Sequence, residues 1–149
     1  MSSVAPVIRG ANLADAPAIA ALFTELGYPN TPEKIARRLP RLLADDGHRV
    51  LVADDGAVIG CVHIGLFAIL ERDLSAQIMG LVVAATHHRR GVGRALIGAA
   101  EAWAQAQGCG TIYVRTNILR AEAPAFYRGV GYTHTKTQYA FRKALFASP

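Results

Sequence analysis

A basic, glycine-rich turn between a strand pattern and a helix pattern constrains the fold of this chain more than any other sequence feature. Residues 75–85 form a β-rich run that ends without polar alternation, which predicts a strand buried on both faces. Residues 90–107 repeat apolar side chains with the helical period, and Gly108 follows as a favourable helix end. Another β-rich run, residues 111–116, comes next. Two strands joined through a helix in this way lie parallel in one sheet.

Two helices are expected near the N-terminus. Residues 16–26 and residues 31–44 both carry apolar side chains with helical spacing. Thr31 precedes a proline and an acid, which is typical of a capped helix start. Pro40 lies inside the second helix and predicts a kink or a split there.

The β-rich stretch at residues 48–70 turns at Asp55-Gly56, a strong hairpin signal. Weaker patterns predict a short strand at 7–9, a short helix at 123–128 and one or two strands within 132–146. The expected order is β-α-α-β-β-β-α-β-α-β-β. This order gives an α/β fold, with a mixed, mostly antiparallel sheet, one parallel pair, and helices on both faces.

Length and composition predict one domain spanning residues 1–149, because chains of 149 residues rarely divide further. The longest apolar stretch, residues 58–70, is thirteen residues long, whereas a membrane-spanning helix needs about 20. No signal-peptide pattern is visible at the N-terminus. Cys61 and Cys109 are too few for a disulfide framework, so we expect buried, reduced thiols in a cytoplasmic protein.

Charge is distributed unevenly along the chain. Residues 1–75 carry seven Lys/Arg against nine Asp/Glu, a net charge of −2, and residues 76–149 carry nine against two, a net charge of +7. A half-molecule this basic favours a polyanionic ligand. The candidates are nucleic acid, a nucleotide or phosphorylated cofactor, and anionic lipid, against the alternative of a merely solvated basic face.

The turn at residues 88–96 favours the phosphorylated ligand. Gly91 and Gly93 allow the backbone to curl so that several N–H groups point into one concavity. The following helix adds its unpaired N–H groups and the positive end of its dipole. Arg89, Arg90 and Arg94 add fixed charge. The turn is therefore expected to bind a pyrophosphate, although it lacks the patterns of a Walker loop and of a dinucleotide-binding fingerprint.

Two motifs carry a family resemblance. Residues 90–95, Arg-Gly-Val-Gly-Arg-Ala, match the R/Q-x-x-G-x-G/A signature of the GNAT superfamily of N-acetyltransferases. Residues 116–132, from Thr116-Asn117 to Gly131-Tyr132, resemble the second signature of that superfamily. The predicted order of strands and helices is also the family's order, so the resemblance covers nearly the whole chain. It implies an enzyme that transfers acetyl groups from acetyl-CoA.

The resemblance also implies where acetyl-CoA binds. It would lie in a V-shaped opening between the strands at 77–84 and 111–116. Its pantetheine would pair with the strand backbone, its pyrophosphate would bind the N–H groups of residues 90–95, Asn117 would face the pantetheine arm, and Tyr127 would reach the sulfur. The cofactor-binding residues so implied are Leu81, Val82, Val83, Arg89, Arg90, Gly91, Val92, Gly93, Arg94, Ala95, Asn117 and Tyr127. Tyr127 is also the expected catalytic residue, because a phenol can hydrogen-bond or protonate a leaving thiolate.

The proton acceptor is not evident from the sequence. Similar sequences often carry an acid in the cofactor strand, where this chain has Gln77. The alternatives are His63, Glu71, Asp73, Glu25 or water alone, and His63 can equally be a half-buried strand histidine. In similar folds the walls of the acceptor site come from the first two helices and from hairpin loops. These are expected here at residues 22–32 and in a loop at 67–75, whose acids suit a cationic amine.

The sequence therefore predicts transfer of an acetyl group to a primary amine, on a small or peptide-like acceptor, by direct attack in a ternary complex. The alternative is a regulatory or degenerate domain that binds acyl-CoA without catalysis. Nucleic-acid binding lacks a supporting motif. The adjacent His87 and His88 do not predict a metal site, because neighbouring residues rarely point at one ion. A homodimer is expected because dimers are common among similar proteins.

Overall fold

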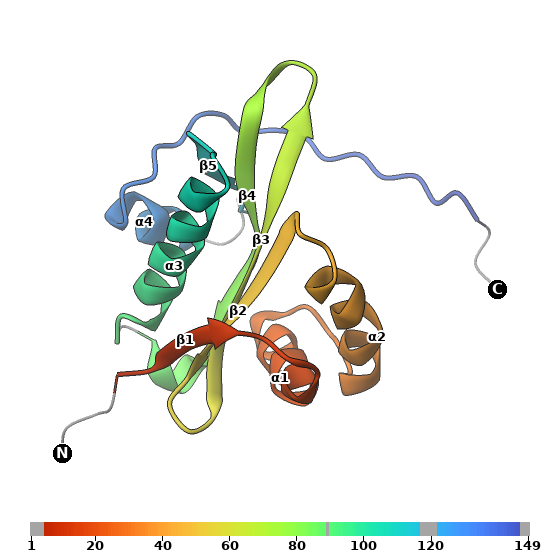
Figure 1. Cartoon of the computed structure of the whole chain (residues 1–149), viewed down its shortest axis with the longest axis vertical. Helices are drawn as coiled ribbons and strands as arrows, with labels where there is room; N and C mark the ends of the chain where they lie inside the picture. Colours follow the sequence, from red (N-terminus) through yellow and green to blue (C-terminus); the bar gives the residue numbers. More distant parts are fainter. Residues whose placement is uncertain (1–4, 89, 117–121, 147–149) are drawn as a thin grey trace. The chain divides into compact units, whose positions relative to one another are not determined.

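A five-stranded sheet, drawn in Figure 1, organises the first of two compact units, which ends at Arg115; the second begins at Thr116. The computed structural model describes residues 5–88, 90–116 and 122–146. The strands follow one another in the order β1-β2-β3-β4-β5. They are β1 (Val7–Gly10), β2 (His48–Asp54), β3 (Val58–Ile69), β4 (Arg72–Val83) and β5 (Ile112–Val114). Only β4 and β5 pair in parallel, as the strand–helix–strand pattern predicted.

Helices cover both faces of this sheet (Figure 1). They are α1 (Ala16–Leu26) and α2 (Pro32–Leu43) on one face and α3 (Val92–Ala106) on the other, with short 3-10 turns η1 (Leu13–Asp15) and η2 (Ala85–His87). Two neighbouring residues of β3 show that successive side chains point to opposite faces of the sheet. A Cβ atom at Gly60 would lie 2.9 Å from Leu96 of α3, whereas Cys61 packs in a cluster with Ile19 and Leu22 of α1. The predicted α/β fold class is thus confirmed.

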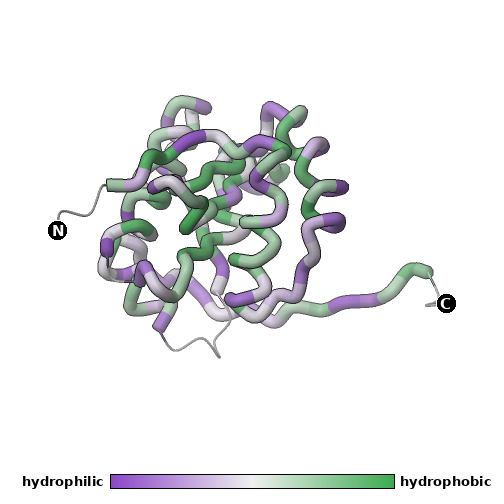
Figure 2. Tube along the Cα trace, turned by 90° about the horizontal axis from the view of Figure 1, so that it is seen from below, coloured by the Kyte–Doolittle hydropathy of each residue, from purple (hydrophilic) through white to green (hydrophobic). Residues whose placement is uncertain are grey.

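Most of the largest fully buried side chains belong to the central strands, and Figure 2 shows the hydropathy along the chain. Val52, Val62 and Ile64 from the strands and Leu96 from α3 are fully buried, each at 0% exposure. Burial of a side chain of this size contributes about 1.5–3 kcal/mol, so these residues hold α3 and the strands together. The described part of the chain contains no helix that is both long and apolar enough to cross a membrane.

The helix boundaries follow local chemistry. Thr31 caps α2, and its hydroxyl accepts from the Lys34 amide. Gly27 ends α1 at φ 108°, a left-handed conformation that favours glycine. The expected kink or split at Pro40 does not divide α2, which runs unbroken from Pro32 to Leu43. Proline removes one amide donor near the helix end, and the Pro40 carbonyl still accepts from Ala44.

Two sequence-based expectations about strands were wrong. Residues 132–146, all described by the structure, contain no strand, although their composition is β-rich. Tyr139 and Phe141 in this segment are 91% and 94% exposed, and a strand needs a neighbouring backbone that composition cannot supply. Residues 67–75, expected as a loop, belong almost entirely to β3 and β4, with only a two-residue turn between Ile69 and Arg72.

Candidate functional site

A β-bulge interrupts β4 at the residue after its last pairing with β5. Gly80 lies opposite His63 and Ile78 lies opposite Ile64, so Met79 has no partner in β3. On its other edge β4 pairs with β5 only at residues 76–78. From Met79 to Val83, β4 therefore has one neighbouring strand within the described residues. The V-shaped opening was expected along this stretch, where the pairing with β5 has ended.

Hydrogen bonds show which backbone groups face the open edge. The Ala84 amide donates to the Ile59 carbonyl at 2.8 Å, toward β3. Before the bulge, the Ala76 amide donates to the Thr111 carbonyl at 3.0 Å, toward β5. Alternate residues of a strand direct their N–H and C=O groups to opposite edges. After the bulge, Leu81 and Val83 therefore direct theirs to the open edge, and Val82 directs its groups to Cys61 in β3.

The chain just after β4 is fixed by two side chains. His88 Nε2 lies 2.9 Å from the Val83 carbonyl oxygen, and since a carbonyl only accepts, that ring nitrogen carries the hydrogen. Glu25, at the end of α1, accepts from the Ala85 amide at 2.6 Å. The open edge thus ends in a defined turn, with the Val83 carbonyl already hydrogen-bonded.

The start of α3 follows this turn. Gly91 precedes the helix at φ +79°, and no side chain caps the helix. The first amides of a helix have no intrahelical acceptor and carry the positive end of the dipole. The Ala95 amide is an exception, because it already donates to the Gly91 carbonyl at 3.0 Å. Arg90 and Arg94 are exposed beside this helix start, while Arg89 lies outside the described residues.

The remaining predicted cofactor residues belong to the second unit. Asn117 lies outside the described residues. Tyr127 lies in α4 (Glu122–Gly129) and is half-buried. Its ring meets Phe126 edge-on at 5.1 Å and Tyr132 at 5.7 Å between ring centres. That the Tyr127 hydroxyl reaches the cofactor sulfur stays a prediction.

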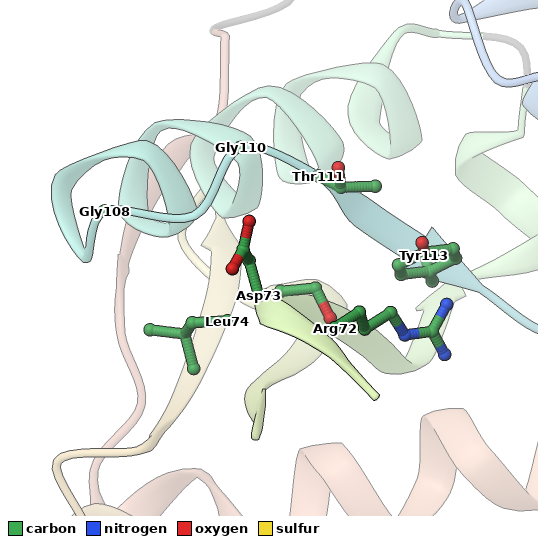
Figure 3. A pocket seen from close by; sticks show the side chains of 8 residues that line it. Arg72, Asp73, Leu74, Gly108, Gly110, Thr111 and Tyr113 are labelled. Atoms are coloured by element: carbon green, nitrogen blue, oxygen red, sulfur yellow. The ribbon is translucent and has the colours of Figure 1, made fainter. Parts of the chain in front are cut away.

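The candidate proton acceptors lie in different places. Asp73 lines a cavity at the start of β4 and β5, where the Arg72 guanidinium stacks over Tyr113 at 4.6 Å (Figure 3). Asp73 precedes Met79 by six residues, about 20 Å along a strand, and Glu71 lies in the turn before β4. Gln77, which stands where an acid is often found, lies before the bulge and pairs with Tyr113 in β5.

His63 lies closest to the bulge along the sheet, because it pairs with Gly80. Its Nε2 is 2.9 Å from His48 Nδ1 in β2. Burial, and to a smaller extent the charge of His48, lower the pKa of His63 to about 4. At neutral pH the His63 ring is therefore uncharged.

Sequence reasoning missed the bulge and the contacts made by His88, Glu25 and His48. One signal was available, since an isolated glycine such as Gly80 within a strand often marks a bulge or a close approach. A Cβ atom there would lie 3.2 Å from the Phe23 ring of α1. The side-chain contacts depend on strand register and on packing, which local patterns do not encode.

Comparison with known proteins places this geometry among the acetyltransferases. The model of the acetyltransferase (GNAT) family matches residues 16–132. An aminoglycoside N(6')-acetyltransferase type 1 from Stenotrophomonas maltophilia is 30% identical over 97% of each chain. The enzyme of the same name from Klebsiella aerogenes is 25% identical over 94% of this chain and 97% of its own.

Solved structures agree in fold. The aminoglycoside 6'-N-acetyltransferase AAC(6')-IG from Acinetobacter haemolyticus superposes with a TM-score of 0.82 at 23% identity, over 93% of this chain and 99% of its own. AAC(6')-Iy in complex with CoA superposes with a TM-score of 0.84 at 19% identity, over 96% of this chain and 99% of its own.

Proposed function

Because this chain belongs to the GNAT family of acetyltransferases, as its motifs predicted, we propose that it acetylates a primary amine of a small, cationic acceptor. It is an acetyl-CoA-dependent N-acetyltransferase, which disfavours the alternative of a domain without catalysis. The amine would attack the thioester directly within a ternary complex. The observation that carries the proposal is the open edge of β4, which leads directly to the uncapped start of α3.

Leu81 and Val83 would bind the pantetheine arm. Their backbone groups face the open edge of β4, and an extended arm with two amides can pair with them as a strand would. Val82 would hold this segment onto β3 through Cys61. Because His88 already donates to the Val83 carbonyl, the Val83 amide is the better candidate for a direct bond.

The start of α3 would bind the pyrophosphate. The amides of Val92, Gly93 and Arg94 occupy the first turn, where an anion is stabilised by the helix dipole and by N–H donors. Arg89, Arg90 and Arg94 would add charge. Gly91 sets the turn through its left-handed backbone. Ala95 would contribute only as part of the helix, because its amide already donates to the Gly91 carbonyl.

Asn117 and Tyr127 complete the proposal. Asn117 would hydrogen-bond the pantetheine arm, and the Tyr127 hydroxyl would stabilise the departing thiolate. A phenol with a pKa near 10 can donate a hydrogen bond to a thiolate whose conjugate acid has a pKa of about 8.5. The amine nitrogen would form its bond to the acetyl carbon as the carbon–sulfur bond breaks.

An aminoglycoside or a similar amino sugar is the acceptor class that we propose. Two relatives that match nearly the full chain bear that name. The first 75 residues carry a net charge of −2 against +7 for the rest, so the first part of the chain favours a cationic acceptor and the second part favours the anionic cofactor. Electrostatic attraction of this kind mainly raises the rate of association.

Thiol release tests this function. We would mix the full-length protein with acetyl-CoA and a panel that contains aminoglycosides, linear polyamines and N-terminal peptides. The expected result is CoA release that depends on an aminoglycoside, with a mass increase of one acetyl group on the acceptor. Turnover only with peptides would contradict the acceptor class, and no turnover with any amine would contradict the function.

We also propose that the protein works in the cytoplasm as a homodimer of one-domain chains that span residues 1–149. Both cysteines are free thiols. Large apolar side chains of the second unit, Tyr139, Phe141, Leu145 and Phe146, are 85–94% exposed, and such a group favours an association surface. Light scattering after gel filtration would give twice the chain mass for a dimer, and the mass of one chain would contradict it.

A further inference from the structure

Cofactor binding supplies no role for the titratable pair His63 and His48. The two rings come from neighbouring strands, β3 and β2, and their facing nitrogens are 2.9 Å apart. The hydrogen bond between the two rings needs one donor and one acceptor, so a single proton lies between their facing nitrogens. The outer nitrogen of His48, Nε2, lies 3.9 Å from an Asp45 carboxylate oxygen.

The position of the pair relative to the open edge points to the reacting atoms. If the pyrophosphate lies at the start of α3 and the pantetheine runs back along Val83 and Leu81, the thioester reaches the bulge at Met79 and Gly80. His63 is the residue of β3 that pairs with Gly80. It shares a face with Cys61, which packs against α1, so it lies on the face covered by α1 and α2.

The other acidic candidates lie farther along the strand. Asp73 is six residues from Met79, about 20 Å at the rise of a strand. Glu25 is bound to the Ala85 amide, five residues past Gly80. On the face of His63, β4 contributes Gly80 and Met79, which carry no charge, and α1 contributes Phe23 against Gly80. Among the contacts given for the described residues, His63 thus meets His48, and His48 in turn meets Asp45.

We propose that His63 takes the proton of the attacking amine, directly or through one water molecule, and passes positive charge to His48. This inference rests on the proposed acetyl transfer. In the resting pair, His63 Nε2–H donates to His48 Nδ1, which leaves His63 Nδ1 as the proton acceptor. When Nδ1 takes the amine proton, the Nε2 proton moves to His48. The amine nitrogen bonds to the acetyl carbon, the carbon–sulfur bond breaks, and the thiolate takes a proton from Tyr127 or from solvent.

The second ring explains how a buried histidine can act as a base. Burial disfavours a charge on His63, whose pKa is lowered accordingly. Transfer to His48 places the charge beside the exposed Asp45 carboxylate, where opposite charge and water both stabilise it. His63 is therefore the catalytic residue of the pair, and His48 is a positioning residue that sets its basicity.

Turnover at saturating substrates would be measured from pH 3.5 to 9.5, a range that includes the His63 pKa of about 4, for wild type, His63→Gln, His48→Gln and the control His134→Gln. His134 is exposed in the second unit and contacts Thr137. A general base contributes about 10²–10⁴-fold, so His63→Gln should lower kcat at least about 30-fold with acetyl-CoA affinity unchanged. His48→Gln should lower kcat about tenfold and move the acidic limb of the profile to higher pH, because His48 then no longer lowers the pKa of His63, and a purely structural role would not do this. His134→Gln should match wild type.

Nitrogen-15 NMR of the histidine rings provides a readout that does not need turnover. Near neutral pH we expect His63 protonated on Nε2 and unprotonated on Nδ1, and protonation on Nδ1 would overturn the relay. If wild type turns over and the kcat of His63→Gln stays within threefold of the wild-type value at every pH, the proposal is also overturned. If His63→Gln does not fold, an unshifted acidic limb in His48→Gln has the same force. Absence of wild-type turnover with every amine would overturn the acetyl transfer itself.

Discussion

The two parts of β4 have different neighbours although they belong to one continuous strand. Residues 76–78 pair with β3 on one edge and β5 on the other, and Ala76 and Ile78 are 0% and 3% exposed. Residues 80–83 pair with β3 alone within the described residues, and the unpaired Met79 is 43% exposed. One unmatched residue thus divides a structural segment from a segment whose backbone groups remain available for a ligand. The bulge thus marks the residue at which the pairing with β5 has ended.

The largest expected effect comes from the helix start that follows the open segment. Gly93→Asp would place a side chain and a negative charge where the pyrophosphate is proposed to bind, so acetyl-CoA affinity should fall by more than about 100-fold, since a buried like charge costs several kcal/mol. Gly98→Asp is the matched control, because Gly98 is an exposed residue of the same helix with open space around it. Calorimetry on both folded variants measures the difference, and equal affinities would contradict the anion site.

A smaller effect on the chemical step is expected in the second unit. If the Tyr127 hydroxyl stabilises the thiolate, Tyr127→Phe should lower kcat at least about tenfold, while acetyl-CoA affinity stays within a few-fold because the ring remains. If the hydroxyl only supports packing with Phe126 and Tyr132, the variant should melt earlier and turn over normally. Kinetics and a thermal melt of one preparation separate these cases.

The alternation within the open segment predicts opposite outcomes for adjacent proline variants. Leu81→Pro removes an amide that faces the open edge, so acetyl-CoA affinity should fall about 3- to 10-fold, the effect of one net hydrogen bond. Val82→Pro removes an amide that faces β3, so the free energy of unfolding should fall by about 1–3 kcal/mol. Chemical denaturation and calorimetry test both variants. Equal losses of stability would mean that the alternation is assigned wrongly.

The smallest expected effect is a pH dependence of stability. The folded pKa of His63, about 4, is lowered from the usual 6.5 by burial and by His48. Between these values the unfolded chain binds more protons, so this contribution is fully present above pH 6.5 and is lost as the pH falls toward 4. We expect about 1 kcal/mol, since partial solvent contact reduces the effect. Wild type should therefore lose more stability than His63→Gln over this range, and parallel curves would contradict the shift.

The sequence predicted those features of the fold that depend on interactions between residues close together in the chain. Thr31, Gly91 and the Asp55-Gly56 turn act over a few residues, so composition and spacing placed the helix starts and the hairpin correctly. The order of the first nine predicted strands and helices followed from such signals. Residues 132–146 carry the composition of strands without forming one, because pairing requires a partner and not only suitable side chains.

The details of the site required the sheet itself. The bulge at Met79 is defined only by the pairing of its two neighbours, Ile78 and Gly80, with β3. The contact between His48 and His63 joins residues 15 positions apart in the sequence. The sequence analysis offered His63 as one of several candidate proton acceptors. Strand register then placed it opposite Gly80 and placed Asp73 far along the strand, which no local pattern could do.

Hydrogen–deuterium exchange of the β4 amides, followed with and without saturating acetyl-CoA, tests the central claim most directly. The Leu81 and Val83 amides face the open edge, so they should exchange quickly in the free protein and slowly with acetyl-CoA. The Val82 amide, directed to β3, should be protected in both states and serves as the internal control. Bound acetyl-CoA that leaves Leu81 and Val83 exchange unchanged would contradict the proposal that this edge is its binding site.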